Sequence, residues 1–134
     1  MTDPKQILIV EDDEDIQVIY RKMILDTFDG IEVVQRLNGQ EGLDAVQQKK
    51  PDLILLDLLM PVMNGQVFLE NLRQKLRLLE IPVVVCSVNQ PLANKLLKNR
   101  VVEAVLPKVF KIDDLVKVFF KFLGLQPKQN APGL

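Results

Sequence analysis

The chain has 134 residues, 48% of them hydrophobic, and a formal net charge of -1, which predicts one globular domain with its own core. Because the charge is balanced and no basic stripe carries interleaved aromatic residues, direct nucleic-acid binding is not expected. The absence of histidine and the single cysteine argue against a zinc site and exclude an internal disulfide. No secretory signal or membrane-spanning segment is evident, so we predict a cytoplasmic protein without membrane contact.

Five short apolar segments alternate with longer amphipathic ones. The short segments have the length and composition of strands that are buried on both faces of a parallel sheet. Cys86 falls in the fourth of them and is expected to be a small buried apolar residue. We expect the five strands at residues 6–10, 32–35, 53–57, 81–87 and 101–106.

Apolar residues at helical spacing predict five helices between and after these strands. In the first helix the apolar stripe is Ile16, Ile19, Tyr20 and Met23, and in the second Leu43 and Val46 are expected to face inward. The third helix carries Val67, Phe68, Leu72 and Leu76. A short fourth helix spans about residues 92–98, and the fifth runs from Ile112 to Leu123 and stops at Gly124. The expected core stripe of the fifth is Ile112, Leu115, Val116, Phe119 and Leu123, with Val118 and Phe120 off it.

This alternation predicts an α/β fold with a doubly wound, five-stranded parallel sheet and helices on both faces. The expected strand order is 2-1-3-4-5, the flavodoxin-like arrangement, which places the first and third strands side by side. We expect one domain over residues 1–123. Residues 124–134, which include Pro127 and Pro132, are expected to form a short flexible tail.

Carboxylates follow two of these strands directly. Asp57 comes after the apolar run 53–56, at the strand end where open α/β sheets place their ligand crevice. Glu11 and Asp12 follow the first strand, whereas residues 13–15 are explained by capping of the next helix and by its dipole. If the two strands are neighbours, three carboxylates converge and repel one another unless a cation lies among them. Hard oxygen ligands of this kind favour Mg²⁺.

A hydroxyl and an ammonium group follow two further strands. Ser87 ends the fourth strand and Lys108 follows the fifth. Each has an ordinary interpretation, Ser87 as a turn residue or helix cap and Lys108 as a solvated loop charge. Together with the three carboxylates, however, they form the kind of group that positions and neutralises a phosphoryl group during its transfer.

Over about residues 5 to 123 the sequence resembles the receiver domain of two-component response regulators, including the stand-alone receivers of chemotaxis. Each matching motif is weak alone, but their order and spacing together are specific. The motifs are Ile7-Leu8-Ile9-Val10-Glu11-Asp12, Pro51 to Asp57 with Met60-Pro61 and Asn64-Gly65, Pro82 to Ser87, and Leu106-Pro107-Lys108 with Phe110.

The resemblance implies a role for each site residue. Asp57 would accept a phosphoryl group from a histidine kinase or a phosphotransfer protein. Glu11, Asp12, Asp57 and the backbone carbonyl of Leu59 would hold Mg²⁺. Ser87 would hydrogen-bond the phosphoryl group, and Lys108 would pair with it. The protein would then be a signalling module, not an enzyme, and would catalyse only its own phosphoryl transfer and a slow dephosphorylation.

The resemblance also implies output through protein contact. The face made by the fourth helix, fifth strand and fifth helix would bind a downstream partner or a second copy of the chain. Apolar residues outside the core stripe of the fifth helix, such as Phe120, either belong to an interaction patch on this face or are singly exposed residues without a function. A role as a relay intermediate, which passes the phosphoryl group onward, is compatible with the same residues.

The chain departs from the family pattern at three valines. Val105 replaces the switch aromatic of the family, and Val88 stands where a small residue is usual and is expected to crowd access to Asp57. Val109 replaces a proline whose bond to the lysine is often cis. Because a cis bond before a non-proline residue costs roughly 2.5–4 kcal/mol, we predict a trans Lys108–Val109 bond, or else a strained cis bond that its surroundings retain.

These departures leave alternatives. The chain could be a receiver-like scaffold that binds partners without phosphorylation. It could also be a Mg²⁺-dependent hydrolase of the aspartate-nucleophile type, but those enzymes carry a second aspartate where this chain has Leu59. The same leucine predicts slow self-dephosphorylation. A flavodoxin-like nucleotide binder fits the fold, but no glycine-rich phosphate loop follows the first strand.

Overall fold

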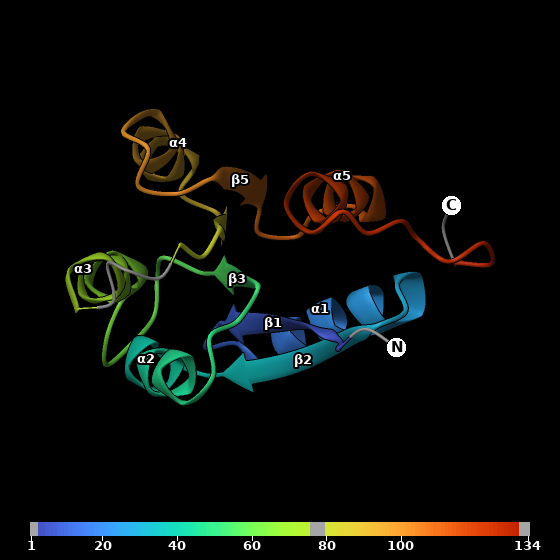
Figure 1. Cartoon of the computed structure of the whole chain (residues 1–134). Coiled ribbons are helices and arrows are strands. Elements are labelled where there is room, and N and C mark those ends of the chain that lie inside the picture. Colours follow the sequence, from blue (N-terminus) through green and yellow to red (C-terminus); the bar gives the residue numbers. More distant parts are fainter. Residues whose placement is uncertain (1–2, 76–79, 132–134) are drawn as a thin grey trace.

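The computed structural model describes residues 3–75 and 80–131. Its core is one sheet of parallel strands in the order β2-β1-β3-β4-β5, as predicted. The strands are β1 (Lys5–Val10), β2 (Ile31–Arg36), β3 (Leu53–Leu56), β4 (Val83–Ser87) and β5 (Ala104–Pro107). The helices are α1 (Glu14–Thr27), α2 (Gly39–Gln48), α3 (Gly65–Lys75), α4 (Gln90–Lys98) and α5 (Ile112–Leu123). Figure 1 shows α1 and α5 on one face of the sheet and α2, α3 and α4 on the other.

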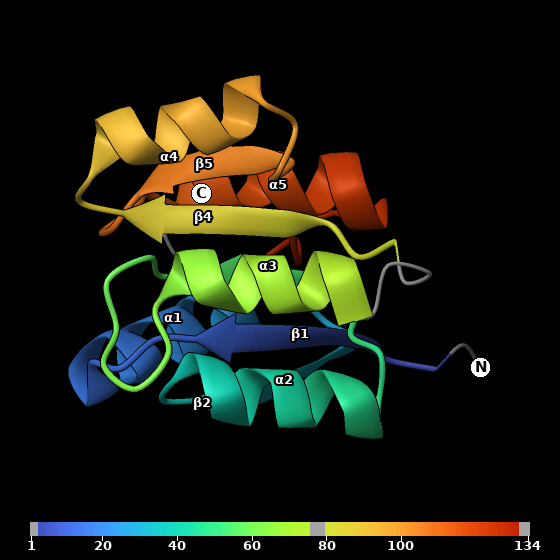
Figure 2. The same cartoon turned by 90° about the vertical axis from the view of Figure 1, so that its left-hand side faces the viewer.

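Alternating side chains of the strands supply two cores, one on each face of the sheet. In β1, Leu8 and Val10 pack with the buried residues of α2 and α3, whereas Ile7 and Ile9 pack with those of α1 and α5. This alternation explains why the strand is apolar throughout, since both of its faces are covered by helices. Figure 2 shows α2, α3 and α4 in front of the sheet, with the arrowheads of β1 and β4 pointing toward the same edge.

The register aligns the strand ends at that edge. Val10 pairs with Leu56 across β1 and β3, and Ser87 pairs with Pro107 across β4 and β5. The residues that follow each strand therefore emerge side by side. Asp13 caps α1, because its Oδ1 accepts hydrogen bonds from the N–H groups of residues 15 and 16 at 2.9 and 3.2 Å, as the capping interpretation predicted.

Two strands begin later than the sequence predicted. β4 begins at Val83 and not at residue 81, and Pro82, which has no N–H, contributes only its carbonyl, to Ile54 N. β5 begins at Ala104 and not at residue 101. The reason is that Val101 N bonds the carbonyl of residue 96 and thereby closes the turn after α4.

The helical stripes also needed correction. Ile19 was expected on the apolar stripe of α1 but is exposed, as is Val67 of α3. Val118 was expected off the stripe of α5 but is buried between α5 and the sheet. The buried side of α5 is therefore wider than the predicted apolar stripe. Leu43, Val46, Phe68 and Leu72 are buried as predicted, and Leu76 lies outside the described residues.

The chain after α5 runs back toward the end of α1. Lys128 N donates to Thr27 O at 2.8 Å, and Lys128 Nζ donates to Leu25 O at 2.9 Å. Ala131 is buried. The domain limit at residue 123 and the flexibility of 124–134 remain predictions. Within the two described ranges, no helix is long and apolar enough to span a bilayer.

Candidate functional site

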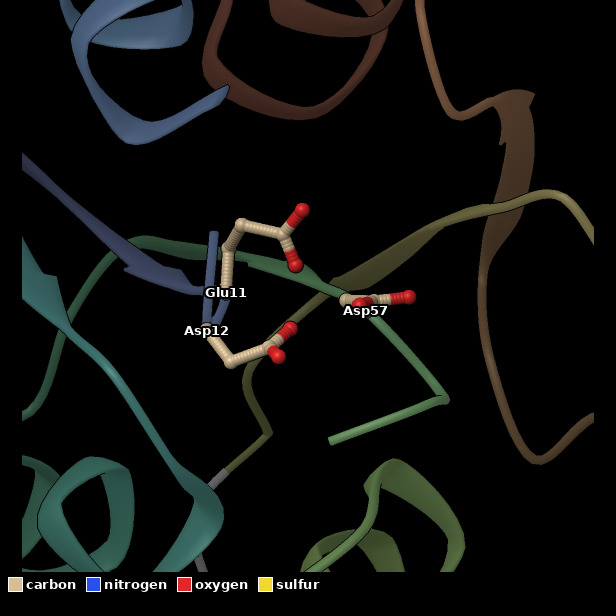
Figure 3. A group of neighbouring side chains, drawn as sticks. All are labelled: Glu11, Asp12 and Asp57. Atoms are coloured by element: carbon tan, nitrogen blue, oxygen red, sulfur yellow. The ribbon is translucent and has the colours of Figure 1, made fainter. Parts of the chain in front are cut away.

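Three carboxylates meet at the carboxyl edge of the sheet, as the strand order predicted. One carboxylate oxygen from each of Glu11, Asp12 and Asp57 lies within 4.8 Å of the others, and Figure 3 shows the three side chains gathered there. Backbone hydrogen bonds hold two of these residues, since Asp57 N donates to Val10 O at 3.0 Å and Glu11 N donates to Arg36 O at 3.1 Å. Glu11 and Asp57 are only 1% and 3% exposed, whereas Asp12 is exposed.

Lys108 is the cation of this cluster. Its Nζ lies 2.9 Å from Glu11 Oε1 and 3.1 Å from Asp57 Oδ2, so one ammonium group contacts both buried carboxylates. The contact with Glu11 lies outside hydrogen-bond geometry, and Glu11 Oε2 has no hydrogen-bond partner among the described residues. Buried oxygens normally have such a partner, so the cluster is short of both donors and positive charge.

The pKa values reflect this shortage. Burial, and after it the neighbouring Asp57 carboxyl group, raise the pKa of Glu11 to about 8, although Lys108 lowers it. For Lys108, burial lowers the pKa, but the two carboxylates outweigh burial and raise it, so the ammonium keeps its charge. An unpartnered buried carboxylate oxygen beside two further carboxylates is a fit for a hard divalent cation such as Mg²⁺. The residues present therefore suit the predicted metal.

Ser87 and Leu59 lie on the loops beside these groups. Ser87 is fully buried, and its Oγ accepts a hydrogen bond from Asn89 N at 3.0 Å, which is the turn contact that its ordinary interpretation predicted. Gln90 Nε2 donates to the Ser87 carbonyl at 2.6 Å and so ties the start of α4 to the end of β4. Leu59 N lies 3.3 Å from Asp57 Oδ1, while the Leu59 side chain is exposed.

Two side chains on the inner face of α1 hold the backbone of the site, and the sequence analysis did not assign them this role. Gln17 Nε2 donates to the Glu11 carbonyl at 3.1 Å. Tyr20 donates its hydroxyl to the Lys108 carbonyl and stacks on Phe110. The sequence feature that could have indicated this role is Gln17, a polar residue on the inward side of an amphipathic helix, three residues before Tyr20. The sequence analysis assigned Tyr20 only to the core.

The three valines that depart from the family pattern differ in their surroundings. Val105 is half-buried and packs against the core between the sheet and α4. Val88 and Val109 are exposed, and the Lys108–Val109 bond is trans, as predicted. The side chain of Val88 thus has considerable solvent contact beside the site, and its predicted crowding of Asp57 remains a prediction.

Exposed aliphatic side chains lie on the three loops around the acidic cluster. We call this set the apolar rim. Solvent-exposed valines and leucines are ordinary when single, but several on adjacent loops are typical of a contact surface. The rim consists of Leu59, Val62, Val88 and Val109.

Comparison with known proteins gives consistent results. The family described as the response regulator receiver domain matches residues 7–120. The polar-differentiation response regulator DivK of Brucella anthropi is 29% identical over 122 residues, which cover 90% of this chain and 98% of DivK. The probable C4-dicarboxylate response regulator DctR of Bacillus subtilis is 28% identical over 94% of this chain, but the match spans only 55% of DctR. The chemotaxis protein CheY4 of Vibrio cholerae superposes with a TM-score of 0.77 at 26% identity, covering 90% of this chain and 99% of CheY4.

Proposed function

The chain belongs to the receiver domain family of two-component response regulators, and we propose that it is a signalling module switched by phosphorylation of Asp57. The donor would be a histidine kinase or a phosphotransfer protein, because the chain has no histidine of its own. The observation that carries the proposal is the buried Asp57 carboxylate, held at the sheet edge between the Lys108 ammonium and the acidic pair. A receiver-like scaffold that works without phosphorylation is the alternative.

In the proposed reaction, a carboxylate oxygen of Asp57 attacks the phosphorus of the phosphohistidine in line. The new O–P bond forms as the P–N bond breaks, and the imidazole leaves with the bonding electron pair. Lys108 Nζ, already 3.1 Å from Asp57 Oδ2, would balance the charge of the acceptor and of the incoming phosphoryl oxygens. Ser87 would exchange its contact with Asn89 for a hydrogen bond to a phosphoryl oxygen.

The proposed ligands of Mg²⁺ are the carboxylates of Glu11, Asp12 and Asp57 and the backbone carbonyl of Leu59. Mg²⁺ bound there would supply positive charge that offsets the negative charge of the acceptor and phosphoryl oxygens. The exposed Leu59 side chain offers no polar group to orient an attacking water. We therefore propose that the aspartyl phosphate is hydrolysed slowly and that the hydrolase alternative is the weaker one.

The apolar rim favours a protein donor over a small phosphodonor. Its four exposed residues lie on the loops that follow β3, β4 and β5, and they offer aliphatic surface that a helix bearing a phosphohistidine could cover. A small anionic donor would gain nothing from that surface.

The test is intact-mass spectrometry of the chain after incubation with Mg²⁺ and a phosphorylated histidine kinase, cognate or of broad specificity. We expect one phosphoryl adduct on the wild type and none on Asp57→Asn or in the presence of EDTA. The asparagine variant is a matched control because it keeps the shape of the side chain. No adduct from any protein donor would favour the scaffold alternative, and an adduct that persists in Asp57→Asn would place the acceptor elsewhere.

For output, we propose that the face made by α4, β5 and α5 contacts a downstream protein or a second copy of the chain. In support, β5 is an edge strand, and Phe120 on α5 is 56% exposed. We expect Phe120→Glu to weaken the association about tenfold, or about 1.4 kcal/mol, in sedimentation or binding measurements. A chain that stays monomeric in both phosphorylation states, with partner binding unchanged by the substitution, would contradict this use of the face.

A further inference from the structure

We propose that Tyr20 is a positioning residue for Lys108. In this role Tyr20 holds the backbone of the loop that carries the lysine, so that it contributes to phosphoryl transfer without touching the phosphoryl group. The inference rests on the proposed function, because its main readout is the rate of transfer to Asp57. It adds to that function a residue of α1 that is not part of the acidic cluster.

One side chain holds the loop at two points. The Tyr20 hydroxyl donates to the backbone carbonyl of Lys108, and the Tyr20 ring stacks on Phe110 with ring centroids 4.7 Å apart and planes at 28°. Tyr20 and Phe110 are each 3% exposed, so the contact is inside the core between α1, α5 and the sheet. This hydrogen bond joins α1 to the loop after β5, between two residues that are 88 positions apart in the sequence.

The loop needs such support because the sheet no longer provides it. The last paired residue of β5 is Pro107, and α5 begins only at Ile112. Lys108 is thus the first residue beyond the strand. A lysine side chain is long and flexible, so the place of its Nζ depends on where its backbone is held. Small displacements of a catalytic group have large effects on rate, because proximity and orientation carry much of the acceleration.

The Tyr20 hydroxyl is suited to a constant structural role. Burial is the main cause that raises the pKa of Tyr20, so the phenol stays protonated and remains a donor. One helical turn earlier, Gln17 makes the equivalent contact with the Glu11 carbonyl. The inner face of α1 therefore holds the backbone of the site on both sides, at the acidic pair and at the lysine.

The experiment separates positioning from a plain core role by removing only the hydroxyl. In Tyr20→Phe the stack on Phe110 is kept and the bond to Lys108 is lost. In single-turnover transfer from a phosphorylated kinase, we expect the maximal rate to fall roughly three- to tenfold, the size expected for one lost hydrogen bond. The donor concentration for half-maximal rate should stay unchanged, because the docking surface is not altered.

Two further variants make the test specific. In a Lys108→Ala background, Tyr20→Phe should no longer change the rate, because the residue through which it acts is gone. Thr27→Val is the matched control, since it removes another buried hydroxyl of α1, one with no hydrogen-bond partner among the described residues. It should leave the rate as in the wild type. An unchanged rate in Tyr20→Phe, or an equal loss with and without Lys108, would overturn the proposal.

Failure of the proposed function would look different. In that case the wild type itself would form no adduct on Asp57. Positioning would still be decided by amide hydrogen exchange at residues 108–110, which should be faster in Tyr20→Phe than in the wild type and in Thr27→Val. Equal exchange in all three proteins would show that the hydroxyl does not hold the loop.

Discussion

Gly65→Ala is expected to destabilise the protein by roughly 3 kcal/mol, the upper part of the range for overpacked sites, and to disturb Asp57 at the same time. A Cβ at this position would lie 2.6 Å from the Asp57 carbonyl oxygen and 2.6 Å from Leu58 Cα. Both are backbone atoms, so neither can turn away as a side chain would. Urea unfolding gives the loss of stability, and the rate of adduct formation on Asp57 should fall with it.

Two substitutions nearby serve as controls. Gly42→Ala would bring its Cβ to 2.9 Å from Val10 Cγ2, a side-chain atom that can shift, so a smaller loss is expected. Val62→Gly should be close to neutral or slightly stabilising, because Val62 has φ 67 and glycine adopts that conformation more readily. If Gly65→Ala proves as stable as the wild type, the close approach of the loop backbone to Gly65 is not required.

The strand order and the meeting of the carboxylates could be predicted because both depend on rules that hold along the whole chain. Apolar runs of strand length identify buried parallel strands, and the order 2-1-3-4-5 makes the first and third strands neighbours. Once that order is known, Glu11 and Asp57 must emerge at one edge. Their convergence needed no knowledge of side-chain contacts.

The parts that were wrong or missed depend on distant partners. The segment before β5 has the sequence pattern of a strand. Its structure, however, depends on Glu103, whose carboxylate accepts a hydrogen bond from Val83 N at 2.6 Å and forms an ion pair with Arg73. Val83 and Arg73 are both far from Glu103 in the sequence. The bond between Tyr20 and Lys108 joins residues 88 apart, and no local pattern reports it. A tyrosine on a helical stripe is equally consistent with simple burial.

Lys108→Met is expected to destabilise the protein and to make its stability depend on Mg²⁺. Lys108 Nζ contacts two carboxylates that are almost completely buried, and methionine keeps the apolar stem but removes the charge. Removing one partner of a fully buried ion pair costs about 3–5 kcal/mol. Here we expect roughly 1–3 kcal/mol, because the Lys108 side chain is partly exposed and water reaches the cluster.

The dependence of stability on Mg²⁺ shows whether Lys108→Met destabilises the protein through the lost charge or through lost packing. Lys108→Met leaves the buried Asp57 carboxylate without its cation, so added Mg²⁺ should stabilise Lys108→Met more than the wild type, and EDTA should remove the difference. The added substitution Asp57→Asn should recover much of the lost stability, because it removes the buried charge that has lost its cation. Lys95→Met, at an exposed position of α4, is the matched control and should change neither stability nor its response to Mg²⁺. Urea unfolding of the four proteins with Mg²⁺ and with EDTA makes the comparison. Equal responses to Mg²⁺ in Lys108→Met and the wild type would mean that Lys108 does not balance the charge of this cluster.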